Sequence, residues 1–454
     1  MSTQALSAAQ AKMRAAGVNE TAVAIFTAYY RQLEEGSTGI IPESSIEPVP
    51  DLARYEDLAG SDDDRDALAQ TAVIRLNGGL GTSMGLSRAK SLLPVRDGLT
   101  FLDLIARQVL WARERYQVRL PLVLLHSFST RDDSLAALAG YDLQVGGLPL
   151  DMMQSQEPKL LVDDLSPVSW PADPRLEWCP PGHGDIYPTL LESGLLDALL
   201  QEGFRYACVA NSDNLGAAPS ARLAGWFARC GAAFAAEVTP RTPMDVKGGH
   251  IARRRSDGRL VLRETAQTTP DDMRFFTDPA VHPYASTNNL WFDLAQLRQT
   301  LSERNGVLGL ALIRNQKTVD PRDPGTPAVY QVESAMGAAI ECFDQATAIV
   351  VPRSRFVPVK STNELLLLRS DAYRLDDSWV PRATVSPMPV VTLGGAYRNL
   401  TDYEERLPYP PSLTRARSLS VQGDWRFGKG VVVEGDVVLR EDGGSVPDQT
   451  VLKG

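Results

Sequence analysis

A glycine-rich segment, LNGGLGTSMGLSRAKS (76–91), carries the clearest chemical signal in the chain. Four of the eight residues 78–85 are glycine. Glycines after a strand let the backbone approach a ligand closely, and consecutive N–H groups can bind an anion. Lys90 adds a cation for phosphate oxygens. The segment therefore predicts a phosphate-binding loop, with a tight turn that holds no ligand as the simpler alternative.

Three familiar motifs do not fit this segment. A dinucleotide fingerprint needs a third glycine where Met84 stands, and a P-loop needs glycine in place of Ala89. The stretch from Gly81 to Gly85 formally matches the nucleophile elbow of hydrolases, but Ser83 falls several residues after the turn. The sequence thus favours neither a Rossmann dehydrogenase, nor a Walker ATPase, nor a serine hydrolase.

Two further segments place polar groups where a ligand could meet them. CPPGHGDIYPTL (179–190) presents His183 between two glycines, after two prolines that stiffen the approach. VANSDNLGA (209–217) ends an apolar stretch with Asp213. A carboxylate at a strand end suits Mg²⁺, which takes one or two carboxylates plus substrate phosphates. An incidental histidine and a helix N-cap are the plainer interpretations.

Other candidate segments are weaker when each is taken alone. VPRSRFVPVKSTNELLL (351–367) brings two arginines and Lys360 to the start of a helix, which suits an anion but also describes an ordinary basic strand. MMQSQEPKL (152–160) and TNNLWF (287–292) offer amides for a base or for sugar hydroxyls. The remaining histidines are isolated, and we interpret them as structural or surface residues: His126, His250 and His282.

Apolar strands alternate with amphipathic helices around these segments. The pattern predicts one helix over 3–35, a helix over 101–116, and strands in TAVIRLN (71–77), PLVLLHSF (121–128), FRYACVANSDN (204–214) and AAFAAEVTP (232–240). Such alternation indicates βαβ units and a mostly parallel sheet covered on both faces. Ligands of these sheets bind at the carboxyl ends of strands, so the NGG and NSDN segments should share one rim.

The tail after about residue 370 follows a different pattern. Two apolar series recur every six residues: Val421, Phe427, Val433, Leu439, and Leu419, Trp425, Val431, Val437. A six-residue period is typical of a β-helix, in which short strands stack on one another. Simple strand alternation would also give even spacing.

Composition narrows the class of protein. The chain has 454 residues, with 43% hydrophobic and 22% charged residues, which are ordinary globular proportions. A net charge of −10 argues against nucleic acid or an anionic membrane as the main partner. The four cysteines form no C-x-x-C pair, and neither a signal peptide nor a long apolar run is evident. We therefore expect a cytoplasmic protein.

Together the segments resemble the eukaryotic-type UTP–glucose-1-phosphate uridylyltransferases. The similar strings occur in the family order: LNGGLGTSMG with Lys90-Ser91, MMQSQEPKL, PPGHGD, VANSDNLGA, DVKGG, TNNLW, QVESAMGAAI and VPRSRFVPVK. The tail also resembles that family's C-terminal domain. The resemblance implies an α/β fold: a Rossmann-like nucleotidyltransferase core with a mixed, mostly parallel sheet, plus a C-terminal left-handed β-helix. We expect an N-terminal helical segment over 1–50, a catalytic domain over 51–370 and the β-helix over 371–454.

The resemblance also implies roles for single residues. Lys90 and Lys360 are the implied catalytic residues, and Asp213 is the implied Mg²⁺ ligand. The implied UTP-binding residues are Leu76, Asn77, Gly78, Gly79, Lys90, Gln154, Gly182, Asn211, Ser212, Asp213 and Lys360. The implied sugar-phosphate contacts are Gly78, Gly79, His183 and Asn288.

The implied reaction is reversible uridylyl transfer, in which UTP and glucose 1-phosphate give UDP-glucose and pyrophosphate, with Mg²⁺ as cofactor. Two alternatives stay open at this point: an enzyme for another sugar 1-phosphate, such as an N-acetylhexosamine or a broad range of UDP-sugars, and a catalytically silent nucleotide-sugar sensor. We expect no nucleic-acid or membrane partner, and the sequence leaves open whether the protein forms a homo-oligomer.

Overall fold

The N-terminal segment is a pair of helices. The structure, a computed structural model, describes residues 2–242, 245 and 248–454. The predicted single helix over 3–35 is wrong, because α1 (Ser2–Ala15) and α2 (Glu20–Glu34) are separated by a turn. Gly17 takes a φ of +76° there, and Asn19 caps α2 by accepting the N–H of Ala22 at 2.8 Å. Only glycine adopts that backbone conformation readily, so the turn is local in origin.

The central sheet is mixed and mostly parallel, as predicted. Its strands lie in the order β2 (Ala53–Arg54), β18 (Ala346–Val350), β12 (Phe234–Pro240), β15 (Tyr284–Asp293), β11 (Tyr206–Asn211), β3 (Thr71–Asn77), β6 (Leu122–His126) and β7 (Asp151–Met153). Along this path only the two pairs that involve β15 are antiparallel. A side branch of β13 (His250–Arg254), β14 (Leu260–Arg263) and β1 (Ile46–Glu47) joins β15.

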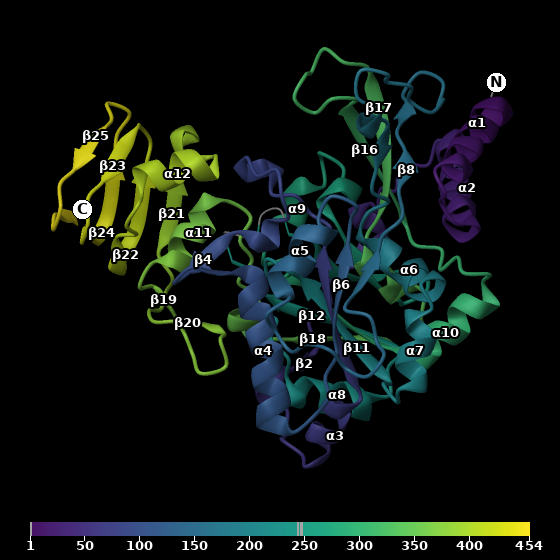
Figure 1. Cartoon of the computed structure of the whole chain (residues 1–454), viewed down its shortest axis with the longest axis horizontal. Helices are drawn as coiled ribbons and strands as arrows, with labels where there is room; N and C mark the ends of the chain where they lie inside the picture. The colour runs from purple at the N-terminus through teal and green to yellow at the C-terminus, as the bar shows by residue number, and fades with distance from the viewer. Residues whose placement is uncertain (1, 243–244, 246–247) are drawn as a thin grey trace.

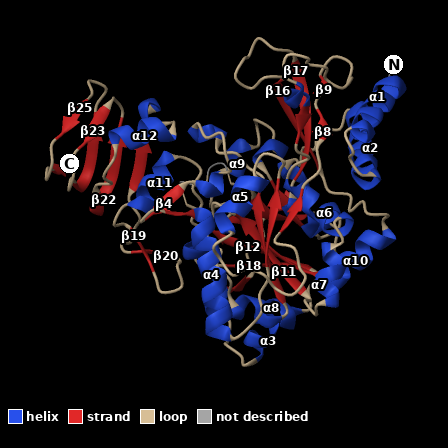
Figure 2. Cartoon of the chain, in the orientation of Figure 1, coloured by secondary structure: helices blue, strands red, loops and turns tan. Residues whose placement is uncertain are grey.

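Helices cover both faces of this sheet (Figure 2). Successive residues of β3 enter different hydrophobic clusters, with Val73 in one and Ala72 and Ile74 in the other. The first cluster contains buried residues of α3 (Asp63–Ala69), α4 (Phe101–Tyr116) and α8 (Ala221–Cys230). The second contains buried residues of α6 (Ile186–Glu192), α7 (Leu195–Gln201) and α10 (Leu294–Glu303). This double burial explains why the strands read as unbroken apolar runs.

A smaller sheet stands beside the N-terminal helices (Figure 1). It consists of β16 (Leu312–Thr318), β17 (Ala328–Ser334) and β9 (Leu160–Leu161), and a separate pair is formed by β8 (Glu157–Pro158) and β10 (Trp178–Cys179). Phe26 and Tyr30 of α2 share a hydrophobic cluster with Leu160 and Leu312. The N-terminal helices thus pack against this smaller sheet.

The tail forms stacked parallel strands (yellow in Figure 1). β21 (Val390–Leu393), β22 (Ser412–Val421), β24 (Val432–Leu439) and β26 (Val451–Lys453) make one sheet, and β23 (Trp425–Phe427) pairs with β25 (Gly444–Val446). Leu419 pairs with Val437, 18 residues further along, which corresponds to three sides of six residues. We call these strands the C-terminal coil.

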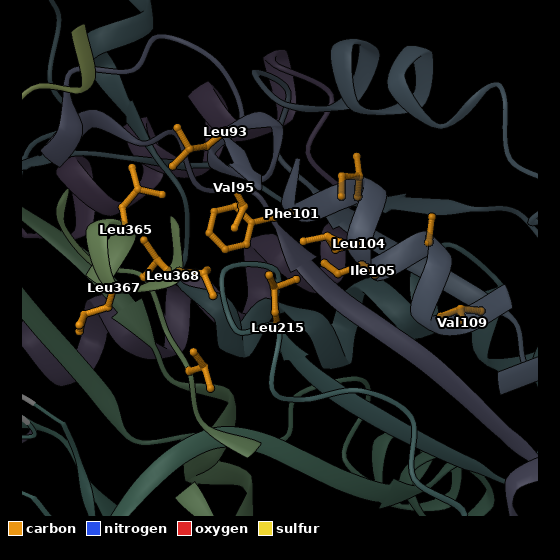
Figure 3. Packing of buried hydrophobic residues seen from close by; sticks show 14 of the residues in the cluster. Leu93, Val95, Phe101, Leu104, Ile105, Val109, Leu215, Leu365, Leu367 and Leu368 are labelled. Atoms are coloured by element: carbon orange, nitrogen blue, oxygen red, sulfur yellow. The ribbon is translucent and has the colours of Figure 1, made fainter. Parts of the chain in front are cut away.

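The coil shares its apolar core with the central domain. Figure 3 shows Phe101 of α4 close to Val95 and to leucines of α11 (Thr362–Arg369). The same cluster of buried residues continues through Leu419 and Phe427 of the coil. Within residues 2–242, 245 and 248–454, no helix has both the length and the hydropathy needed to cross a bilayer.

Candidate active site

A cleft of about 390 Å³ opens at the carboxyl ends of β3 and β11. It brings together most of the residues predicted for the site: Leu76, Asn77, Gly78, Gly79, Lys90, Gln154, Gly182, His183, Asn211, Ser212 and Asp213. β3 and β11 are parallel neighbours, with Leu76 paired to Asn211, so their ends meet at one edge. The expectation that the NGG and NSDN segments share a rim is confirmed.

The glycine segment folds back on itself at this edge. Lys90 N–H donates to the carbonyl of Gly79 at 3.1 Å, and Leu80 forms a bridge with Ala89. This return brings Lys90 beside the end of β3. A Cβ on Gly78 would lie only 3.1–3.3 Å from the side-chain amide of Gln154, so glycine permits the close approach of these two segments.

Lys90 and Asp213 form an ion pair in the cleft lining. Their Nζ and Oδ2 atoms lie 2.6 Å apart, and both side chains are about one-fifth exposed. The other carboxylate oxygen, Asp213 Oδ1, is buried and has no hydrogen-bond partner among the described residues. The same is true of Ser212 Oγ. A cation and two unpaired oxygens at one rim suit a ligand that carries negative charge and a metal ion.

The protein supplies only some of the oxygen ligands that Mg²⁺ needs. Among the described residues, no group of three or more His, Cys, Asp or Glu side chains could hold a metal ion. Mg²⁺ commonly binds through one carboxylate, substrate phosphates and water. Asp213 Oδ1 is suited to be that carboxylate oxygen.

His183 is held as a neutral hydrogen-bond donor. Its Nδ1 accepts the backbone N–H of Met336 at 2.9 Å, so the proton of the neutral ring lies on Nε2. Burial lowers the pKa of His183 to about 4. The neighbouring Gly182 has a φ of +79°, and a Cβ there would lie 2.5 Å from the carbonyl of Ser334. The loop is therefore fixed against the end of β17.

Asn77 lines the cleft, but its side chain is engaged elsewhere. Its Nδ2 donates to Ser134 Oγ at 2.9 Å and lies 3.2 Å from His126 Nδ1. Burial lowers the pKa of His126 to about 4. All three histidines interpreted as structural or surface residues are buried, so the structural interpretation holds for His126, His250 and His282.

Two predicted residues lie next to the cleft lining. Asn288 donates to Asn211 Oδ1 at 3.0 Å and has a φ of +57°. Lys360 is exposed, and the preceding residue, Val359, donates its N–H to the carbonyl of Asp213 at 3.2 Å. Both residues are therefore tied to the strand that ends in the NSDN segment.

Three further polar residues of this region were not predicted from the sequence: Ser127, Asp185 and Glu264. Ser127 donates to the carbonyl of Gly78 at 2.8 Å. Asp185 accepts the N–H of Ser155 at 2.6 Å, next to Gln154, and burial raises its pKa to about 6. Burial also raises the pKa of Glu264, and the charge of Lys360 opposes that rise. Asp185 stands in the PPGHGD string itself, whereas the other two show no sequence signal.

One segment of the resemblance cannot be placed in full. In DVKGG, Asp245 accepts hydrogen bonds from Thr242 and from Arg353. Val246 and Lys247 lie outside the described residues.

Comparison with known proteins gives a consistent result. The family model described as UTP--glucose-1-phosphate uridylyltransferase matches residues 23–434. The uridylyltransferase of Hordeum vulgare is 37% identical over 452 residues, which cover 96% of this chain and 93% of that protein. The Saccharomyces cerevisiae enzyme is 35% identical over 437 residues, with 94% and 86% covered.

Solved structures agree over almost the whole chain. The UDP-glucose pyrophosphorylase of Leishmania major, solved in open and closed forms, aligns with a TM-score of 0.94 at 41% identity, covering 99% of this chain and 98% of that one. A mutant of the same enzyme in complex with UDP-glucose gives the same values. The Trypanosoma brucei protein gives a TM-score of 0.92 at 40% identity, with 99% and 100% covered.

Proposed function

Because this chain belongs to the UTP–glucose-1-phosphate uridylyltransferase family, we propose how the residues of its cleft carry out the family reaction. The protein converts UTP and glucose 1-phosphate to UDP-glucose and pyrophosphate, reversibly. The observation that carries the assignment of roles is the meeting of the glycine segment, Lys90 and Asp213 at one rim.

The physical task is to bring two anions together and to offset the charge that develops on the α-phosphoryl oxygens and the leaving pyrophosphate. Such catalysis rests mainly on positioning and electrostatics. We assign the backbone of Gly78 and Gly79, with Lys90, to the triphosphate. Lys360 offsets charge as the sugar phosphate attacks in line. The sugar phosphate is already ionised at neutral pH, so the reaction needs no general base.

We assign Mg²⁺ to Asp213. The unpaired Oδ1 supports this role, because the opposite oxygen is occupied by Lys90. When bound, the cation would neutralise phosphate charge. Asp213 holds it at the rim, and Lys90 keeps the carboxylate oriented.

The assignment is tested by turnover with UTP, Mg²⁺ and a panel of sugar 1-phosphates. We expect glucose 1-phosphate to be the preferred acceptor and pyrophosphate to be released in equal amount. Preference for an N-acetylhexosamine phosphate would reassign the sugar, and binding of UDP-glucose without turnover would make the protein a sensor.

The transfer should proceed by direct displacement, without a uridylylated enzyme. A covalent role for His183 would need a free lone pair on Nε2, but that atom carries the proton because Nδ1 accepts from Met336. We assign Nε2–H to the sugar phosphate as a donor. We expect inversion at the α-phosphorus, and no exchange of labelled pyrophosphate into UTP unless glucose 1-phosphate is present. Ready exchange with UTP alone would establish a covalent intermediate.

Gln154 should select the base. A side-chain amide can pair with both a donor and an acceptor on uracil, and Gln154 lies against Gly78 at the cleft wall. We expect Gln154→Ala to reduce the preference for UTP over CTP by about 10- to 100-fold, the cost of leaving polar groups unpaired. kcat/KM for the two nucleotides measures this. Gln156→Ala is the matched control, and an unaltered preference in Gln154→Ala would place the base elsewhere.

Two further proposals concern the fold of the C-terminal coil and the cellular location of the protein. We propose that the C-terminal coil is a left-handed β-helix, since its strands are parallel and repeat after 18 residues. We also propose a cytoplasmic location. The cysteines of the described chain are all free, as expected in a reducing compartment.

A further inference from the structure

Asn214 follows the proposed metal ligand and is almost completely buried, with 1% of its surface exposed. Its Oδ1 accepts the N–H groups of Val357 at 2.9 Å and Gly216 at 3.2 Å. Its Nδ2 donates to Asn289 Oδ1 and to the carbonyl of Arg355, both at 3.1 Å. An amide has two donor hydrogens and two acceptor lone pairs, so every position is used. The backbone partners also fix which side-chain atom is oxygen.

These bonds attach one stretch of chain to another that is far away in the sequence. Residues 355–359 run beside residues 213–214. Asn214 forms a bridge with Pro358, and the N–H of Val359 donates to the carbonyl of Asp213 at 3.2 Å. The next residue is Lys360. The side chain of Asn214, together with the backbone bond from Val359 to Asp213, therefore sets Lys360 in register with Asp213.

A buried ion pair between Glu237 and Arg355 stabilises the segment that Asn214 binds. Glu237 is 1% exposed and accepts from the guanidinium of Arg355 at 2.7 and 2.8 Å. Glu237 also accepts from Asn289 at 3.1 Å and from Trp291 at 2.9 Å. Arg355 thus donates through its side chain to Glu237 and accepts through its carbonyl from Asn214. The ring of contacts leaves the amide of Asn214 with one orientation.

We propose that Asn214 is a positioning residue for uridylyl transfer, which acts by holding the segment that carries Lys360 in a fixed register beside Asp213. The proposal rests on the functions proposed above for those two residues. An asparagine is required, because a carboxylate could not donate to Asn289 and Arg355, and an apolar side chain would leave buried N–H and C=O groups unpaired.

The test is a double-mutant cycle of Asn214→Ala and Lys360→Ala. We expect Asn214→Ala alone to lower kcat by about 10²-fold, the usual cost of a misplaced reacting group. At saturating Mg²⁺, which offsets any weakened metal binding at Asp213, the same substitution in the Lys360→Ala background should lower kcat much less, because the lysine that it positions is already absent. We also expect the Mg²⁺ concentration for half-maximal activity to rise in Asn214→Ala, since the backbone of Asp213 loses its register.

A structural role alone would lower the melting temperature without this pattern. Trp291→Phe is the control, because it removes the bond from the Trp291 side chain to Glu237 in the same network and leaves the hydrogen bonds of Asn214 in place. Its kcat and Mg²⁺ requirement should stay near wild type. If Asn214→Ala does not fold, Asn214→Ser, which keeps a small neutral group that can donate and accept, serves in the same cycle. If kcat of the double variant falls by the product of the two single-variant factors, the positioning role of Asn214 is overturned. A wild-type rate in Lys360→Ala alone would instead remove that lysine from the proposed function.

Discussion

Lys90→Ala should lower kcat for UDP-glucose formation by about 10²–10³-fold, because it removes a preorganised cation from developing phosphate charge. Lys90 lies at the rim with its Nζ 2.6 Å from Asp213 Oδ2, and its side chain is about one-fifth exposed. The substitution opens the cleft to water but leaves the core intact, so the melting temperature should change little. Initial rates at saturating UTP and glucose 1-phosphate measure the effect.

Lys360→Ala should show a loss of the same size, about 10²–10³-fold in kcat, for the same reason. Lys453→Ala, on the exposed edge of the C-terminal coil, is a suitable control for loss of one lysine. A variant that retains wild-type turnover would exclude its lysine from the mechanism, and the two lysines are judged separately.

Asp213→Asn should also lower kcat strongly, and unlike Lys90→Ala it should weaken the binding of Mg²⁺. The amide keeps the size of the side chain but removes the negative charge that would hold Mg²⁺ and that pairs with Lys90. We expect kcat to fall by about 10²-fold or more, as for loss of one electrostatic element of a phosphoryl-transfer site. The Mg²⁺ concentration for half-maximal activity should rise as well, and a magnesium titration separates this effect from that of Lys90→Ala.

Asp151→Asn is the control for this experiment. Asp151 also pairs with a cation, Arg131, but at the start of β7 and outside the cleft lining. It should leave the magnesium titration unchanged. If Asp213→Asn behaves in the same way, Asp213 is only a cap at the end of β11 and the metal must bind elsewhere.

Strands and rim residues were the predictable part of this molecule. β3 coincides with the predicted strand 71–77 and α4 with the predicted helix 101–116, because their periodicity is local and their ends carry turn or capping residues. The six-residue series also anticipated the pairing of Leu419 with Val437. The sharing of one rim by NGG and NSDN follows from parallel strand order alone.

Other features depend on contacts between distant parts of the chain. The proton position on His183 is set by Met336, which is 153 residues away. The role of Asn214 depends on Val357, 143 residues away. The break between α1 and α2 has a local cause, the positive φ of Gly17. It was not predicted because the apolar spacing on either side is compatible with a continuous helix. Periodicity reports which face is buried and cannot report which partner satisfies a buried polar group.

The apolar cluster that runs from α4 through α11 into the C-terminal coil has a thermodynamic consequence. Arg96 reinforces this junction by donating to the carbonyls of Leu368, Ser370 and Tyr373. A solenoid that touched only its own rungs could melt alone, while this one must expose apolar surface of the central domain in order to do so. Unfolding of the coil and of the catalytic core is therefore coupled in free energy, and the two ends of the cluster gain or lose their order as one cooperative unit.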